Sequence, residues 1–225
     1  MIPSSASAIR LRRRLAAMTI AVMAAAALLS VSAEPVEAAD VCTGPECDTI
    51  AFVDGQARFD LYEDLVASSD VGSFLYGNPG DEPLMGDWDC DGDDTPAMYR
   101  RSQGFMYLRN SNTQGVADLK FYFGNPGDIP IAGDFNGDGC DTLSIYRPSR
   151  ARVYISNELG NGPADYEYYF GNIGDIPFVG DFDDDGTDTI ALHRRSTGLV
   201  YYRNSNSAGF ADRSFVFGDP NDRVF

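Results

Sequence analysis

The sequence is poor in histidine and lysine, two of the residues that catalytic sites use as bases. Among its 225 residues there is one histidine, His193, and one lysine, Lys120. A Ser-His-Asp or Cys-His mechanism needs a histidine within hydrogen-bond reach of the nucleophile. His193 instead takes a position that Tyr99 and Tyr146 hold in the repeats described below, which predicts a packing role. Pairs of acids could serve glycoside hydrolysis, but the acids here follow a repeated loop pattern described below, so we expect no enzymatic activity.

Positive charge is also scarce, and helical patterning is missing. The chain carries 17 Lys and Arg against 34 Asp and Glu, a net charge of −17. Such an acidic chain repels phosphate backbones, which excludes nucleic acid as a partner. No segment beyond residue 38 shows a 3.6-residue apolar period, whereas 12 Tyr and 14 Phe favour packed strands over disorder. These features predict an all-β protein.

Only one long apolar run is present, from about Leu15 to Val31. It follows an arginine-rich stretch, 10–14, and precedes two candidate cleavage signals of small residues, 31–33 and 36–38. A basic segment, a short apolar segment and such a site are typical of a secretory signal peptide. A retained membrane anchor is the alternative, but the run falls short of the ~20 residues that a spanning helix needs. We therefore expect residues 1–38 to be removed, leaving a secreted chain with no membrane span.

A repeat of 47 residues organises the rest of the chain. Three stretches align without a gap at this interval: Phe74–Arg100, Phe121–Arg147 and Tyr168–Arg194. A fourth start, Phe215–Phe225, follows one interval later, and Asp48–Val53 matches the end of a unit. Repeats of this length indicate a solenoid, a propeller or an array.

Each unit contains four short segments with strand character. In the middle unit they are Pro130–Phe135, Thr142–Arg147, Arg152–Asn157 and Tyr166–Phe170. Short β-rich runs between Gly, Pro, Asn and Asp predict strands. Four strands in about 45 residues is the size of one propeller blade. The predicted fold class is therefore a β-propeller of four-stranded blades.

The strand count predicts four blades, one of which is completed by both ends of the chain. The propeller covers 39–225, with a partial blade at 48–76, full blades at 84–123, 131–170 and 178–217, and a closing strand at 223–225. Pairing of the N- and C-terminal strands closes the ring and leaves no free sheet edge. The alternatives are an open arc that closes on dimerisation and a part of a larger propeller.

An acidic loop follows the first strand of every full unit. Counted from its first acid, each loop has oxygen-bearing side chains at positions 1, 3 and 5, glycine at position 6 and an acid at position 8. Calcium takes about six to eight oxygen ligands, and the glycine permits a sharp turn around the ion. We expect about three calcium ions, held by Asp87, Asp89, Asp91, Asp94, Asp134, Asn136, Asp138, Asp141, Asp181, Asp183, Asp185 and Asp188. Backbone carbonyls at position 7 add to these ligands, from Asp93, Cys140 and Thr187.

These loops are not EF-hands. An EF-hand needs a bidentate Glu at position 12, where this chain has Met98, Ile145 and Leu192. The equivalent stretch of the first unit, 40–48, lacks the acid spacing, so no calcium is expected there. The alternative for all loops is that they are Asp- and Gly-rich turns that only cap the strands.

The units resemble FG-GAP or VCBS-type repeats, the family that includes the integrin α-subunit propeller. The resemblance rests on Phe123-Gly124 and its equivalents, and on the Gly-Asp-Phe-Asn-Gly-Asp-Gly stretch at 133–139. It implies calcium in the blade loops, a secreted or surface location, and a role in binding or adhesion. The chain departs from the family in two ways. The family commonly has seven blades, and its loops place the last acid at position 9, where this chain has Thr95, Thr142 and Thr189.

Four cysteines in an exported chain predict two disulfides. Cys42 and Cys47 flank the degenerate loop of the first unit, so a local bridge could take the place of the ion there. Cys90 and Cys140 would then pair between neighbouring loops, which requires their Cα atoms to lie within ~7 Å. The sequence leaves open whether adjacent loops come that close.

The predicted function is that of a secreted, calcium-binding module for binding or adhesion, with an extracellular protein or glycan as partner. A calcium-dependent lectin is the first alternative. In it, tyrosines and the loops at 107–115 and 201–209, with Arg109 and Arg203, contact sugar hydroxyls. The second alternative is an accessory part of a polysaccharide hydrolase or lyase.

Overall fold

The computed structural model describes residues 7–10, 50–62 and 70–219 of the chain. Within these ranges every regular element is a β-strand, and the strands form four antiparallel sheets of four strands each. The prediction of an all-β fold is confirmed. The described ranges contain no helix that is long and apolar enough to cross a membrane.

Each sheet is one blade, and its strands follow one another in chain order. The first blade contains β1 (Ser7–Arg10), β2 (Ile50–Val53), β3 (Arg58–Tyr62) and β4 (Asp70–Leu75). The second contains β5 (Glu82–Gly86), β6 (Thr95–Arg100), β7 (Phe105–Leu108) and β8 (Leu119–Tyr122). The third contains β9 (Ile129–Gly133), β10 (Thr142–Arg147), β11 (Arg152–Ile155) and β12 (Tyr166–Tyr169). The fourth contains β13 (Ile176–Gly180), β14 (Thr189–Arg194), β15 (Leu199–Tyr202) and β16 (Arg213–Val216).

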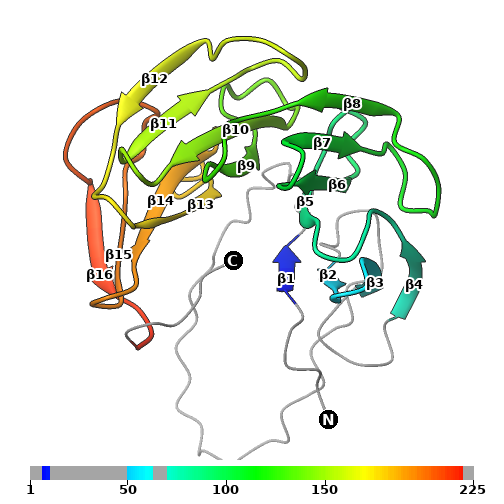
Figure 1. Cartoon of the computed structure of the whole chain (residues 1–225). Helices are drawn as coiled ribbons and strands as arrows, with labels where there is room; N and C mark the ends of the chain where they lie inside the picture. The colour runs from blue at the N-terminus through cyan, green and yellow to red at the C-terminus, as the bar shows by residue number, and fades with distance from the viewer. Residues whose placement is uncertain (1–6, 11–49, 63–69, 220–225) are drawn as a thin grey trace, which may run out of the picture.

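The blades stand around a common centre. Their first strands are neighbours in the order β1, β5, β9 and β13. Figure 1 shows the four sheets fanned out along an arc, with the first blade at one end and the fourth at the other. This arrangement confirms the predicted four-bladed β-propeller.

The innermost strand of the first blade comes from a different segment than predicted. The sequence assigns this place to residues 223–225, which lie outside the described ranges. In the structure β1 occupies it, paired antiparallel with β2 from Ser7 opposite Val53 to Arg10 opposite Ile50. Strand pairing uses backbone groups, so any extended segment can satisfy the edge of β2. β1 belongs to the predicted signal peptide, and removal of residues 1–38 would free that edge again.

Apolar side chains fill the three boundaries between consecutive blades. We call the face of a blade that packs against the next blade its trailing face, and the opposite face its leading face. The trailing faces contribute fully buried side chains such as Phe59, Met106 and Val153. The leading faces contribute Met98, Leu143 and Leu192. Burial of one such side chain stabilises the fold by roughly 1.5–3 kcal/mol.

Position within the blade explains the burial of the second strands. β6, β10 and β14 are buried on both faces, because they lie between two other strands and face a neighbouring blade. His193 in β14 is only 1% exposed. The packing role predicted for this histidine is therefore confirmed.

A repeated ion pair ties the entry of each full blade to its second strand. In the third blade, Arg147 donates from Nε and Nη2 to the two carboxylate oxygens of Asp128, both at 2.7 Å, and from Nη1 to Tyr154 Oη at 3.0 Å. Asp128 also accepts the backbone N–H of Asn125 at 2.8 Å. The same pairing joins Asp81 to Arg100 and Asp175 to Arg194. These pairs were not predicted, although Asp and Arg recur at the same two positions of every full unit.

Candidate metal centres

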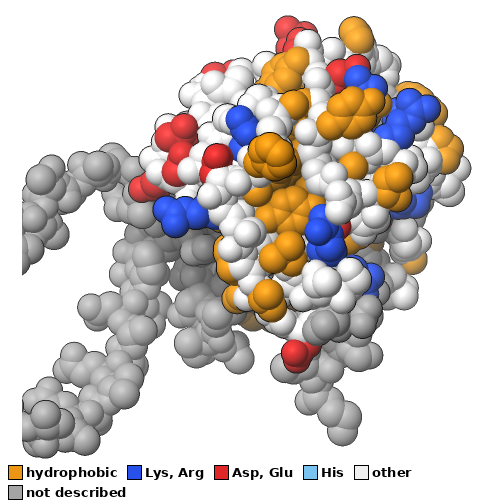
Figure 2. All heavy atoms as spheres, turned by 90° about the vertical axis from the view of Figure 1, so that its left-hand side faces the viewer, with side chains coloured by type: hydrophobic (Ala, Val, Ile, Leu, Met, Phe, Trp, Pro, Cys, Tyr) orange, Lys and Arg blue, Asp and Glu red, His pale blue; other side chains and the backbone are white. Residues whose placement is uncertain are grey.

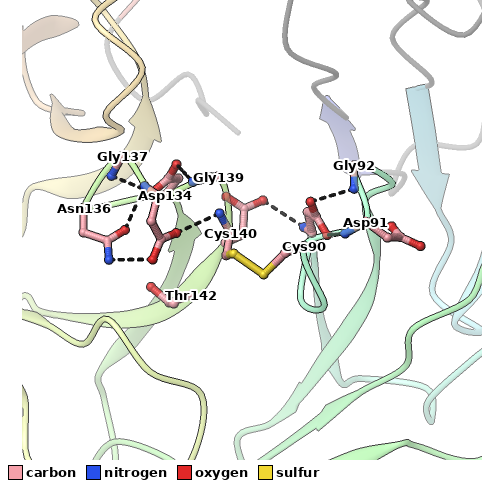
Figure 3. Close-up of a disulfide and its surroundings, with 12 residues drawn as sticks. Cys90, Asp91, Gly92, Asp134, Asn136, Gly137, Gly139, Cys140 and Thr142 are labelled. Atoms are coloured by element: carbon pink, nitrogen blue, oxygen red, sulfur yellow. Dashed lines mark hydrogen bonds between the residues drawn. A yellow bond between two sulfur atoms is a disulfide. The ribbon is translucent and has the colours of Figure 1, made fainter.

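Three acidic loops occupy the same place in the second, third and fourth blades. They follow the first strand of each blade: Asp87–Asp94 after β5, Asp134–Asp141 after β9 and Asp181–Asp188 after β13. We call them the second-, third- and fourth-blade loops. Figure 3 shows the second- and third-blade loops facing each other across a blade boundary.

The first aspartate of each loop organises the loop backbone. In the second-blade loop, Oδ1 of Asp87 accepts the N–H of Asp91 at 3.0 Å, and Oδ2 accepts the N–H of Gly92 at 2.9 Å. Asp181 accepts the two equivalent N–H groups at 3.1 and 2.8 Å. Burial acts to raise the pKa of Asp181, but such backbone hydrogen bonds outweigh it and hold the pKa below the ordinary value. The first acid of the fourth-blade loop is therefore kept charged.

The turn at positions 4 to 7 has the same shape in all three loops. Position 4 has a left-handed backbone, with φ of 64° at Cys90, 73° at Gly137 and 63° at Asp184. The carboxylate at position 5 then accepts the N–H of position 7, at 2.9, 2.9 and 2.8 Å in the three loops. This common turn folds positions 1, 3 and 5 towards one another.

Three carboxylates converge in two of the loops. The ligand oxygens of each triad lie within 4.8 Å of one another: Asp87, Asp89 and Asp91 in one, and Asp181, Asp183 and Asp185 in the other. Loss of hydration within the loop, followed by the charges of Asp91 and Asp87, raises the pKa of Asp89. Carboxylate oxygens are ligands that hard divalent cations prefer. These two triads could therefore hold metal ions.

The third-blade loop differs because Asn136 takes position 3. Its Nδ2 donates to Oδ2 of Asp138 at 2.8 Å, and its Oδ1 accepts the N–H of the same residue at 3.2 Å. Asp134 still accepts the N–H groups of the turn, at 2.7 to 3.1 Å. This loop thus keeps the frame of the other two with one charge fewer.

The acids at position 8 lie at blade boundaries. Oδ2 of Asp141 accepts the N–H of Asp87 at 2.9 Å, and the N–H of Asp141 donates to the carbonyl of Asp87 at 2.9 Å. Asp188 makes the same two hydrogen bonds with Asp134, at 3.0 and 2.7 Å. Asp94 holds the equivalent position in the second blade and is 8% exposed. Where the sequence predicts terminal ligands, the structure places Asp141 and Asp188 against the preceding blade, outside the converging triads.

A disulfide joins the second- and third-blade loops. It links Cys90 to Cys140, whose Cα atoms are 4.8 Å apart, inside the ~7 Å limit for a bridge (Figure 3). The loops come this close because the hydrogen bonds between Asp87 and Asp141 hold their backbones together. The predicted pairing of these two cysteines is confirmed. Cys42 and Cys47 lie outside the described ranges.

The arginines that the sequence offers as sugar contacts hold their own loops in shape. Arg109 donates to the carbonyls of Thr113 and Val116 at 2.8 and 2.7 Å. Arg203 donates to the carbonyl of Phe210 at 3.0 Å. These bonds favour the interpretation that both segments are ordinary surface loops.

Comparison of the chain with known proteins adds no family or function to this description. No family model matches the chain, and no curated protein matches its sequence. The chemistry of these loops therefore follows from their own residues and geometry.

Proposed function

We propose that this chain is a secreted β-propeller that binds calcium in its blade loops and acts as a non-catalytic binding or adhesion module. The observation that carries the proposal is the convergence of three carboxylates in the second- and fourth-blade loops. The resemblance of the units to FG-GAP or VCBS repeats belongs to the same proposal, because it also implies calcium in these loops.

Repulsion within the triads supports a resident cation. Two unit charges 4 Å apart repel by about 1 kcal/mol in water, and by more where protein excludes water. Backbone N–H groups offset this at Asp87 and Asp181, whereas the pKa of Asp89 is raised. Calcium accepts irregular sets of oxygen ligands, while magnesium demands near-octahedral geometry and keeps several waters. Loops built from flexible carboxylates and one amide therefore favour calcium.

The disulfide supports the extracellular part of the proposal. Disulfides persist in oxidising compartments and are rare where thiols are kept reduced. The Cys90–Cys140 bridge lies at the loops themselves. An oxidising environment would thus preserve the arrangement of the proposed calcium sites.

The absence of catalysis is supported by the position of the histidine. His193 is 1% exposed and lies in the middle of a blade. A general base must reach the proton that it removes, and a side chain sealed between blades cannot contact a substrate.

A lectin is a second candidate on one observation. Tyr122 and Tyr169, on the outermost strands β8 and β12, are 51% and 60% exposed. The guanidinium of Arg152 lies 4.8 Å from the ring centre of Tyr169. Exposed aromatic rings beside cations offer stacking and hydrogen-bonding partners to sugars. Binding on a glycan array that is lost in Tyr169→Ala would favour this candidate over protein adhesion.

Thermal unfolding tests the calcium proposal. The protein is heated in EGTA, in millimolar calcium and in millimolar magnesium. A ligand at 100 times its Kd adds about 2.7 kcal/mol per independent site. We therefore expect calcium to raise Tm by many degrees and magnesium to raise it less. The same Tm under all three conditions would overturn the proposal.

Single substitutions locate the effect. Asp89→Asn and Asp183→Asn each remove one exposed carboxylate from a triad. Both should reduce the calcium-induced rise in Tm, while Tm in EGTA should stay the same or rise slightly, because each change removes a repulsion within its triad. Glu158→Gln is the matched control, because it removes an exposed acid outside the loops. An equal loss in the control would mean that calcium acts through overall charge.

A further inference from the structure

The trailing face of the fourth blade is exposed where the other trailing faces are covered. In the first three blades, an aromatic pair at the end of the outermost strand packs against the next blade: Phe74 and Tyr76, Phe121 and Phe123, and Tyr168 and Phe170. Five of these six side chains are at most 8% exposed. The fourth-blade equivalents, Phe215 and Phe217, are 47% and 63% exposed.

The exposed surface continues from this pair towards the inner strands. Three more aromatic rings on the same face are only half-buried: Phe178, Phe182 and Tyr202. The third-blade residues at the same positions are at most 5% exposed: Ile131, Phe135 and Ile155. The ring of Phe182 lies 5.9 Å from that of Phe178 and 4.6 Å from that of Tyr202. Figure 2 looks onto the side of the molecule where β16 lies and shows hydrophobic side chains gathered there.

The leading face of the first blade is incompletely covered in turn. Phe52 of β2 takes the position that buried residues hold in the other blades, namely Met98, Ile145 and Leu192, all at most 7% exposed. Phe52 itself is half-buried and packs edge-on against Tyr62 at 5.6 Å. Phe52 is therefore not covered by a preceding blade, whereas the residues at the same position in the other blades are.

Polar groups border this leading face. Arg58 donates to Asp60 at 2.7 Å and to the hydroxyl of Ser73 at 3.1 Å. Asp60 stands where the other blades carry a tyrosine. An aromatic centre with a charged margin is the composition of an association surface rather than of a protein core.

We propose that the trailing face of the fourth blade binds the leading face of the first blade of a second copy of this chain. The same two kinds of face already pack together at three boundaries within the molecule, which supplies the geometry for a fourth contact. On one chain the two uncovered faces lie at opposite ends of the arc (Figure 1). Each copy carries one face of each kind, so a two-fold pair covers both faces of both copies. The inference does not depend on calcium.

Sedimentation velocity of the full chain over a range of concentrations tests this pairing. We expect the mass of a dimer, and a monomer for the double variant Phe215→Ser with Phe217→Ser. Exposed aromatic anchors at the centre of an interface dominate its affinity, so the dissociation constant should rise about 100-fold or more. Tyr122→Ser with Tyr169→Ser is the matched control, because it removes two exposed rings from the outermost strands of other blades. This control should remain dimeric.

A mixing experiment identifies the opposite face. Phe52→Ser disables the leading face, so this variant alone should also sediment as a monomer. Mixed with the Phe215→Ser, Phe217→Ser variant, it should form a one-to-one heterodimer, because one intact face of each kind remains. A wild-type monomer at all concentrations, with a lower Tm in the Phe215→Ser, Phe217→Ser variant, would mean that the face closes on its own first blade. A dimer insensitive to both variants, or no heterodimer on mixing, would equally overturn the proposal.

Discussion

The boundary between the second and third blades and the boundary between the third and fourth share one hydrogen-bonded frame but are fastened differently. At both, a position-8 carboxylate accepts the N–H of the preceding loop's first aspartate, at 2.9 and 3.0 Å. The first boundary adds the Cys90–Cys140 disulfide. The second has Gly137 and Thr187 at the same positions, and a Cβ built on Gly137 would lie 3.0 Å from Thr187 Oγ1. The close approach therefore comes from the backbone frame, and the disulfide only exploits it.

Removing the disulfide should cause the greatest loss of unfolding free energy at these boundaries. Cys90→Ser with Cys140→Ser releases a closure between residues 50 apart in sequence, which should cost about 4 kcal/mol of unfolding free energy. Because the third–fourth boundary forms without a bridge, we expect the variant to fold. Urea unfolding at fixed calcium measures the loss. A change below about 1 kcal/mol would mean that the unfolded chain without the bridge keeps residual structure near these residues, so that the bridge removes little of its entropy.

The buried ion pairs predict a similarity between the two boundaries. The carboxylates of Asp128 and Asp175 are 2% and 3% exposed beside Arg147 and Arg194. Asp128→Asn and Asp175→Asn should each lower the unfolding free energy by about 3 kcal/mol at pH 7, because each leaves a half-buried arginine without its carboxylate partner. Chemical denaturation of both variants checks the equality. A difference above about 2 kcal/mol would show that the disulfide supports one pair.

Acid should erase the effect at Asp175. Burial acts to raise the pKa of Asp175, but hydrogen bonds from Arg194 and Tyr201 outweigh it and hold the pKa below the ordinary value. A depressed pKa gives stability above the unfolded-state pKa of about 3.9, which is lost as the pH falls through the folded-state pKa. The gap between wild type and Asp175→Asn should stay constant from pH 7 to about 5 and shrink below about pH 4. A gap that widens on acidification would contradict this assignment.

A second disulfide, placed between the third and fourth blades, tests whether the two boundaries have the same backbone spacing. Gly137→Cys with Thr187→Cys should form a disulfide, since position 4 is left-handed both at Gly137 and at the native Cys90, with φ of 73° and 64°. We expect a gain of about 2–3 kcal/mol in the oxidised protein. Intact mass and urea unfolding, with and without reductant, measure bridge and gain. Each single variant is the control, and failure to oxidise would show that the two boundaries differ in backbone spacing.

The repeat and the chemistry of the loops could be predicted from the sequence because both are local. The 47-residue period fixes the blades, and the spacing of Asp181, Asp183 and Asp185 brings three carboxylates together through one turn. The sequence could offer the Cys90–Cys140 pairing as a possibility, but it could not predict whether the two cysteines lie close enough to form a disulfide. It depends on how near two loops come across a boundary, and that distance is set by packing.

The features that the sequence could not predict depend on contacts between blades or between distant strands. Asp141 is predicted as a ligand of its own loop, and the structure adds a contact that the loop pattern does not predict: its carboxylate accepts the N–H of Asp87, 54 residues earlier. Similarly, β1 could not be chosen over residues 223–225, because the edge of β2 selects for extended backbone rather than for a sequence motif. The sequence repeat shows which residues the units have in common, but it does not show which residues of neighbouring units are in contact.

The smallest change in unfolding free energy is expected at Asn136, the amide at position 3 of the third-blade loop. Asn136→Asp gives the third-blade loop the same three acids as its neighbours, and replaces the bond from Asn136 Nδ2 to Asp138 with a repulsion. In EGTA this should lower the unfolding free energy by about 1 kcal/mol, while the rise in Tm with calcium should grow. Asn161→Asp adds the same charge at an exposed site outside the loops and should leave the calcium response unchanged. If Asn136→Asp destabilises without strengthening the response, the third-blade loop is a structural turn. The three loops would then differ in their affinity for metal, as well as in the disulfide that joins only two of them.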